Sequence, residues 1–428
     1  MKRRDFVLKS LITMASSPWI NLLGARTRAF ANASDPHFFV LLMVEGGMDV
    51  TLGLDPRLHI KGEGQQDVFL EYRPEQIIQK NGIRLGPAAK SLESFSQDIL
   101  IVNGINMRRD AGHLALQEYL FTGNGAGTEG YLSAKLGYHR LFRDPIDVLT
   151  SGYSFNSGNL PLTTMSLNST MQDSKSTDKI SLFDKEFYIE DGTFGGMVET
   201  SEYINQKIQK IQTQLKENSK SDITKESIEN FVAHLFKEGL SSCFSMELKT
   251  SGGMGFQLDT HSNHAGQEGK PGTHWTQQEL VWNRVSEIFS TFKSTEFRGA
   301  SLFDYTTFMV GSEFSRSPFL NAANGKDHNP FTNSVLLAGK NIQGGKAIGS
   351  SHVITRKKSP TGNAIHIGSV LNYKSGQEIP YGTSIKDKYE GLIFPENLAS
   401  SVLSAFASSA SPKLQKPEAL VIPGLIKS

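Results

Sequence analysis

The order of apolar and polar residues along the chain predicts buried strands separated by helices. Continuous apolar runs at 38–44 (FFVLLMV) and 99–102 (ILIV) indicate strands buried on both faces, and 303–310 predicts another. Residues 113–121 carry a helical pattern, and 276–292 has the apolar stripe of an amphipathic helix. This alternation predicts a doubly wound α/β fold with a mostly parallel sheet.

The middle and the end of the chain follow a different pattern. Residues 166–250 begin with a long stretch rich in Ser, Thr, Lys, Gln and Asn, which predicts a polar helical insertion. Cys243 stands in an apolar stretch that is expected to be helical and buried. The tail predicts a small-residue helix at 396–407 and a last strand around 419–422.

The first 31 residues have the composition of an export signal. Arg3 and Arg4 precede a short apolar stretch, which ends in the small residues Ala29-Phe30-Ala31. The paired arginines resemble the twin-arginine signal, which implies a periplasmic or secreted protein that meets the twin-arginine translocase during export. Residues 36–428 are then expected to form one large domain. No apolar run reaches the roughly 18 residues of a bilayer span, so no stable membrane span is expected.

Removal of this segment changes the charge of the chain. The full sequence has a formal net charge of +1. Six of the 44 Lys and Arg residues and one of the 43 Asp and Glu residues lie in 1–31, which leaves 38 basic and 42 acidic side chains and a net charge of −4. A nucleic-acid binder is disfavoured by this charge. The single cysteine excludes an internal disulfide and a CxxC metal site.

Carboxylates and imidazoles gather after the predicted strands and in two further loops. In open α/β sheets, ligands bind beyond the carboxyl ends of the strands. Asp, Glu and His without Cys suit Zn²⁺, Mn²⁺, Mg²⁺ or Ca²⁺. The candidate metal ligands are Glu45, Asp49, Asp259, His261, His264, Glu313, Asp327 and His328. Arg316, three residues after Glu313, and His113 are the candidate catalytic residues.

Each of these groups also has a structural interpretation. Glu45 and Asp49 could shape a tight Gly-Gly turn, and Asp259 could form an Asx turn. Glu313 and Arg316 could form a surface ion pair. Their joint placement after strands favours the functional interpretation. The GxGxxG match at 125–130 follows a helix instead of a strand, which disfavours a dinucleotide site.

The segments that carry these residues resemble the DUF1501 family over nearly the whole chain after the signal. They are the twin-arginine leader, Glu45-Gly46-Gly47-Met48-Asp49, Gly112-His113 through Thr122-Gly123, Asp259-Thr260-His261, Glu313-Phe314-Ser315-Arg316, Asp327-His328 and Gly344-Gly345. That family is itself similar to the alkaline phosphatase and sulfatase superfamily. The resemblance implies an alkaline-phosphatase-like sheet with a metal-dependent hydrolase site at the strand ends.

The same resemblance implies a role for each matching position. Glu45, with Asp49 as second choice, takes the place of the first metal carboxylate. Asp259 with His261 or His264 matches the ligands in the middle of the chain. Glu313-Phe314 stands where an Asp-His pair is expected, so the carboxylate is kept and the imidazole is not. His328 matches the final metal histidine.

The largest departure from the superfamily concerns the nucleophile. Gly112 stands where a hydroxyl or thiol side chain would begin the helix. Three explanations stay open: attack by metal-activated water, His113 as nucleophile or ligand, or loss of catalysis with binding kept. The sequence therefore favours an exported metal-dependent hydrolase acting on a small-molecule or glycan phosphate or sulfate ester. The alternative is a catalytically degenerate binding or assembly protein on the same fold.

Overall fold

The computed structural model describes most of the chain after the predicted signal. The described residues are 36–57, 70–108, 112–124, 129–139, 146–151, 155–160, 162, 164–167, 206, 210, 228–248, 258–262, 272–354, 365–379, 384–385, 387–406 and 419–427. The predicted signal at 1–31 and most of 166–250 lie outside these residues.

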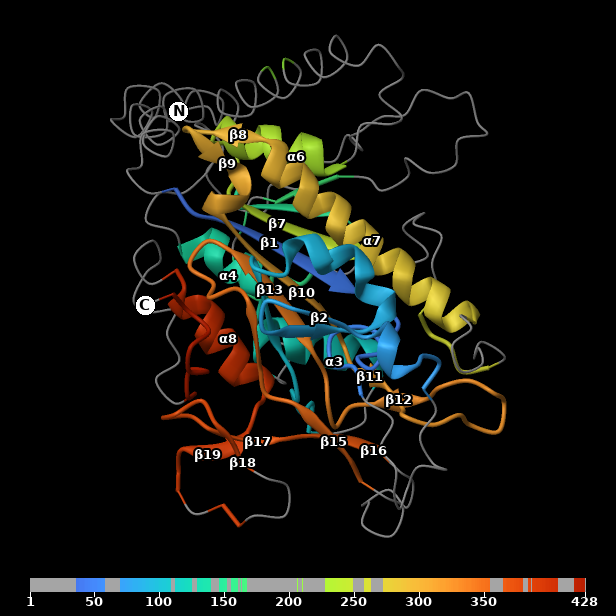
Figure 1. Cartoon of the computed structure of the whole chain (residues 1–428). Coiled ribbons are helices and arrows are strands. Elements are labelled where there is room, and N and C mark those ends of the chain that lie inside the picture. Colours follow the sequence, from blue (N-terminus) through green and yellow to red (C-terminus); the bar gives the residue numbers. More distant parts are fainter. Residues whose placement is uncertain are drawn as a thin grey trace, which may run out of the picture.

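An eight-stranded sheet forms the centre of the described structure, in the order β14-β4-β13-β10-β1-β7-β5-β6 (Figure 1). Its strands are β1 (Phe38–Val44), β4 (Ile99–Val102), β5 (Val148–Ser151), β6 (Thr164–Ser166), β7 (Cys243–Leu248), β10 (Thr306–Ser312), β13 (Val335–Gly339) and β14 (Lys346–Ile348). β13 runs antiparallel to β4 and β10, and the other neighbouring strands are parallel. The predicted mostly parallel α/β sheet is confirmed.

β1 shows why the apolar runs form central strands. All seven of its residues are buried. Side chains alternate between the two faces of a strand. Phe38, Val40 and Leu42 accordingly join one hydrophobic cluster, whereas Phe39 and Leu41 join the other. A strand with an apolar core on both sides must lie in the middle of a doubly wound sheet.

Helices cover both faces of the sheet. One core cluster contains apolar residues of the 3₁₀ helix η3 (Pro87–Phe95), α6 (Ile228–Lys237) and α7 (Thr273–Ser294), and α7 runs along this face in Figure 1. The other cluster contains residues of α3 (His113–Thr122), α4 (Leu132–His139) and α8 (Pro395–Ser404). Within the described residues, no helix is both long and apolar enough to cross a membrane.

The remaining elements are short and lie outside the central sheet. They are η2 (Pro74–Gln76), β2 (Ile78–Lys80), β3 (Ile83–Leu85), β8 (Glu296–Phe297), β9 (Ala300–Ser301), η6 (Leu302–Tyr305), β11 (Ser315–Arg316), β12 (His328–Asn329), β15 (Ser351–Ile354), β16 (Ile365–Gly368), β17 (Val370–Asn372), β18 (Glu378–Ile379) and β19 (Glu390–Leu392). Among them, the β11–β12 ribbon has a direct part in the site.

The structure corrects three predicted elements. Cys243 is buried as expected, but it begins strand β7 instead of lying in a helix. α6 and β7 belong to the core, so residues 228–248 are not part of an insertion. Residues 419–422 form no strand; the nearby pairing is a single bridge between Ile342 and Ile426. Short apolar runs cannot distinguish a buried strand from a buried helix by periodicity alone.

Candidate metal centre

The site is built at the sheet edge where β1, β7 and β10 end. Val44 lies opposite both Ser312 and Leu248 in the register, so the segments after these strands start side by side. The backbone N–H of Gly46 donates to Oε1 of Glu313 at 2.8 Å. Gly46 has φ +103°, and a Cβ there would lie 2.9 Å from the backbone nitrogen of Asp259. Glycine therefore allows this loop to approach Asp259 closely.

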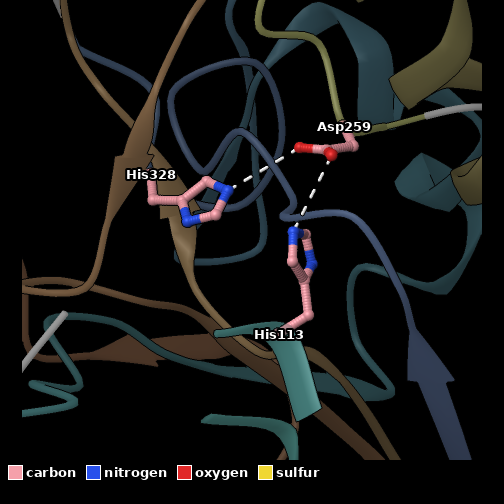
Figure 2. Close-up of side chains that lie close together, drawn as sticks. All are labelled: His113, Asp259 and His328. Atoms are coloured by element: carbon pink, nitrogen blue, oxygen red, sulfur yellow. Dashed lines mark ion pairs between the residues drawn. The ribbon is translucent and has the colours of Figure 1, made fainter. Parts of the chain in front are cut away.

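Two further elements bring histidines to the same edge. In the antiparallel β11–β12 ribbon, Arg316 lies opposite His328. His113 is the first residue of α3, directly after Gly112. Figure 2 shows the imidazoles of His113 and His328 pointing toward the carboxylate of Asp259. Elements that are far apart in sequence therefore converge on one aspartate.

Three histidine nitrogens surround the carboxylate of Asp259. Its Oδ1 lies 3.0 Å from Nε2 of His261 and 3.7 Å from Nε2 of His328. The same two nitrogens are 3.0 Å apart. Its Oδ2 lies 3.8 Å from Nε2 of His113. His113, Asp259 and His328 offer ligand atoms that all lie within 4.8 Å of one another. Part of the predicted ligand set is thus brought together.

The other ring nitrogen of His261 is held by Asp327. Nδ1 of His261 lies 2.9 Å from Oδ1 of Asp327, and the side-chain amide of Asn321 donates to the same oxygen at 2.8 Å. Burial works against ionisation of Asp327, but His261 and Asn321 outweigh it and hold the pKa of Asp327 below its usual value. Because a carboxylate only accepts, Nδ1 of His261 donates to Asp327. Its Nε2 is the nitrogen that lies 3.0 Å from Oδ1 of Asp259.

His113 and His328 have opposite electrostatic environments. Nδ1 of His113 lies 2.6 Å from Oε1 of the buried Glu313, which raises the pKa of His113 above its usual value. Burial and then the guanidinium of Arg316 lower the pKa of His328 to about 4. Phe314 contributes to that burial, because its ring stacks on the His328 ring with centroids 4.0 Å apart. His328 is therefore neutral at neutral pH, as a metal ligand must be.

Arg316 holds the carboxylate of Asp259 from the buried side of the site. Its side chain is fully buried and donates to Oδ1 of Asp259 at 2.7 Å, to the carbonyl of Lys326 at 3.0 Å and to the carbonyl of Gly46. Burial works against the Asp259 anion, but Arg316, together with the nearby histidines, outweighs it and lowers the pKa of Asp259. The predicted catalytic residue is thus a positioning residue in this geometry.

Asp49 occupies a different position from the one predicted for it. Its side chain is completely buried, with Oδ2 2.6 Å from Nζ of Lys326 and 2.9 Å from Nε2 of His274. Its Oδ1 accepts from the backbone N–H and the hydroxyl of Thr51. Burial raises the pKa of Asp49, but Lys326 and His274 together outweigh it and keep that pKa far below its usual value. With both oxygens occupied inside the core, Asp49 is the partner of Lys326 and His274 and not a metal-facing ligand.

Two further predicted ligands are not placed at this centre. Glu45 is half-buried at the end of β1, and in that turn Gly46 supplies the contact with Glu313. His264 lies outside the described residues. Sequence reasoning missed His274 and Lys326, whose only signal is their position: Lys326 directly precedes Asp327-His328, and His274 is the second residue of α7.

One comparison concerns the segment that carries Glu313, Arg316, Asp327 and His328. Residues 294–369 match the DUF1501 family, described as a protein of unknown function. The predicted resemblance to DUF1501 is confirmed over this segment. Among curated proteins, none matches the sequence.

Two solved structures show a distant similarity to the chain. One is a protein in the alkaline phosphatase superfamily from Vibrio parahaemolyticus, with 12% identity, a TM-score of 0.34, and coverage of 76% of this chain and 70% of that one. The other is the lipoteichoic acid synthase LtaP from Listeria monocytogenes, with 6% identity, a TM-score of 0.30, and coverage of 77% and 73%. TM-scores this low carry no argument, so the assignment of the α/β fold is based on the strand order and directions of the central sheet.

Proposed function

We propose that this chain is a metal-dependent hydrolase of phosphate or sulfate esters, with a divalent ion held by Asp259, His261 and His328. The observation that carries the proposal is the triangle formed by Oδ1 of Asp259 and the two Nε2 atoms, with sides of 3.0, 3.0 and 3.7 Å. An ion about 2.0–2.2 Å from each donor, with angles of about 90–120° between the bonds, needs donor atoms roughly 2.8–3.8 Å apart.

The donor set also fits such an ion chemically. Two imidazole nitrogens and a carboxylate oxygen suit Zn²⁺ or Mn²⁺ better than a soft ion. Asp327 fixes the tautomer of His261 through Nδ1, which is the usual supporting contact of a histidine ligand. Oδ1 of Asp259 and the Nε2 atoms of His261 and His328 lie close together, so a cation between them would satisfy all three groups, with Nε2 of His261 deprotonated on binding.

Within this proposal, the remaining residues hold and move protons. A divalent ion at this place supplies Lewis acidity to a phosphoryl or sulfuryl oxygen and lowers the pKa of water. Glu313 favours the protonated form of His113, which is placed to donate a proton from Nε2 to the leaving oxygen. Arg316 keeps the carboxylate of Asp259 in place. Since Gly112 offers no hydroxyl, the attacking group is water.

Assays with chromogenic phosphate and sulfate esters test this function. We expect turnover by the purified chain that depends on added Zn²⁺, Mn²⁺, Mg²⁺ or Ca²⁺ and is lost with a chelator. His113→Gln is expected to lower kcat by about 10²- to 10⁴-fold with little change in KM, because it removes only the proton donor. Metal binding without turnover on any ester would contradict the hydrolase proposal.

One observation favours a second candidate, a degenerate binding protein. A Cβ on Gly112 would meet nothing within 4 Å, so the position where the superfamily has its nucleophile is open and simply lacks a side chain. On this alternative, the centre binds metal and an anionic ligand but turns nothing over.

Export through the twin-arginine translocase, with a periplasmic or secreted location, is part of the proposal. It is supported by Arg3-Arg4 and the small residues at 29–31. Replacing both arginines with lysine is expected to retain the protein in the cytoplasm of a bacterial host, as measured by cell fractionation. Unchanged export of the variant would contradict this route.

A further inference from the structure

A chain of buried polar groups lies directly beneath the proposed metal centre. The hydroxyl of Thr260 lies 2.7 Å from Nδ1 of His274, and Nε2 of His274 lies 2.9 Å from Oδ2 of Asp49. The same oxygen accepts from Nζ of Lys326 at 2.6 Å. All four residues are at most 1% exposed. We refer to Thr260, His274, Asp49 and Lys326 as the inner chain.

The direction of these hydrogen bonds follows from the chemistry of their groups. A carboxylate only accepts, so Nε2 of His274 donates to Asp49. Nδ1 of His274 shares the second hydrogen bond with the hydroxyl of Thr260, which can donate or accept. The order hydroxyl, imidazole, carboxylate is that of a hydrolytic triad. However, Thr260 is only 1% exposed, so no substrate reaches its hydroxyl, and the chain serves as a link instead of a nucleophile.

Thr260 and Lys326, the two ends of the inner chain, are sequence neighbours of the residues at the metal centre. Thr260 stands between Asp259 and His261, and Lys326 directly precedes Asp327 and His328. Thr260 and Lys326 are buried, whereas the side chains of Asp259, His261 and Asp327 beside them are 42–50% exposed. Thr260 and Lys326 therefore face the core, and the residues beside them face outward.

The two ligand-bearing segments are also joined directly. The backbone N–H of Lys326 donates to the carbonyl of Thr260 at 2.9 Å. At Gly325, a Cβ would lie 2.2 Å from the carbonyl carbon of His261, so only glycine permits this contact. Asp49 then fixes both segments to the end of β1, and its backbone N–H is held by Gln278 of α7 at 3.0 Å.

We propose that the inner chain is a positioning device: Asp49 holds Thr260 and Lys326 and thereby sets the separation of His261 from His328. Its consequence for metal affinity rests on the proposed function, whereas its effect on the two imidazoles does not. Loss of a link should loosen the 3.0 Å approach of their Nε2 atoms without removing a ligand. Supporting contacts of this kind affect metal affinity by about 10- to 100-fold.

An ion pair elsewhere in the protein provides a matched control. Arg284 of α7 pairs with the buried Glu229 of α6, which is another carboxylate that depends on one cation. Lys326→Met and Arg284→Met each remove the cation from a buried carboxylate, and both are expected to lower Tm. Thr260→Val is a milder variant that replaces the hydroxyl with a methyl group. Thr260→Ser is its control, because serine keeps the hydroxyl.

The experiment measures Zn²⁺ affinity by calorimetry and the imidazole ¹⁵N resonances of His261 and His328 in metal-free protein. We expect Lys326→Met and Thr260→Val to weaken Zn²⁺ binding at least about tenfold and to shift both resonances. Arg284→Met and Thr260→Ser should do neither. Unchanged affinity and resonances in Thr260→Val, or equal changes in Arg284→Met, would overturn the inference.

Failure of the proposed function gives a different result. If the wild-type protein binds no Zn²⁺, the proposed metal site is wrong. The positioning role of the inner chain is then tested by the imidazole resonances alone. A shift in Thr260→Val that is absent from Arg284→Met supports positioning, and no shift refutes it. If Lys326→Met does not fold, Thr260→Val and Thr260→Ser decide between the same two results.

Discussion

Two groups of polar residues lie at the carboxyl end of the sheet. The outer layer is the proposed metal centre with Asp327, and the inner layer is the inner chain. They differ in how many of their hydrogen-bonding atoms have partners. In the outer layer, the side chains of Asp259 and His261 are about two-fifths exposed, and Oδ1 of Asp259 lies 3.0 Å from Nε2 of His261. In the inner layer, both oxygens of Asp49 are saturated by Lys326, His274 and Thr51 inside the core. A closed network stabilises a geometry, whereas open, closely spaced ligand atoms can hold a cation. The difference separates the residues that we propose to position the site from those that we propose to bind the ion.

The largest effect that sharpens this comparison is expected from Asp259→Ala. This variant removes the oxygen shared by His261 and His328, so we expect metal binding to fall at least about 100-fold, because a carboxylate ligand itself is lost. Metal content after dialysis and calorimetric titration measure it. Asp387→Ala is the matched control, since Asp387 is 41% exposed and also pairs with a cation, Lys374. Equal loss in both variants would contradict a specific site.

Asp49→Asn is expected to have its main effect on stability. The substitution removes the carboxylate charge that faces the buried Lys326 ammonium, and breaking a buried ion pair costs about 3–5 kcal/mol of unfolding free energy. Asp327→Asn, at a half-exposed outer position, should cost less than about 1 kcal/mol. Urea unfolding of both variants measures the difference. Similar losses of unfolding free energy in the two variants would contradict the difference between the buried inner layer and the exposed outer layer.

A smaller effect is expected from the pH dependence of stability at His113. Glu313 raises the folded-state pKa of His113 above its unfolded value, so the stabilisation is full below about pH 6.5 and is lost as pH rises through the raised pKa. The difference in unfolding free energy between wild type and His113→Gln should therefore shrink as pH rises above about 6.5, by under about 1 kcal/mol. A difference that grows with pH would refute the His113–Glu313 contact.

Gly112→Ser is expected to have the smallest effect on stability. The space around Gly112 is open, and serine in place of glycine at a helix N-cap changes stability by only a few tenths of a kcal/mol. If water is the attacking group, ester turnover by the native chain is present and changes little in this variant. Gly112→Ala is the control for added bulk. Turnover that appears only with serine would favour the degenerate alternative.

The fold was predictable where the signal is purely apolar. The run at 38–44 has only one stable placement, a strand with a core on both faces, and the structure gives β1 these bounds. β7 was misread because Cys243 follows a helical segment, and a short apolar run does not reveal its period. The antiparallel direction of β13 depends on tertiary pairing and has no local signal.

The outer layer was partly predictable, and the inner layer was not. Asp259, His261 and His328 stand out because Asp and His clusters follow strands in this chain. Asp49 carries the same signal but points inward, and the sequence does not show which way a carboxylate at a strand end turns. Lys326 could not be predicted as a buried partner, because lysine is almost never fully buried unless it is paired.

Anomalous diffraction from a crystal of this protein grown with Zn²⁺ tests the central claim most directly. We expect one peak about 2.0–2.2 Å from Oδ1 of Asp259 and from Nε2 of both His261 and His328, with the inner chain unchanged beneath it. Ordered Asp259, His261 and His328 with no anomalous peak between them would contradict the metal centre and, with it, the proposed hydrolase.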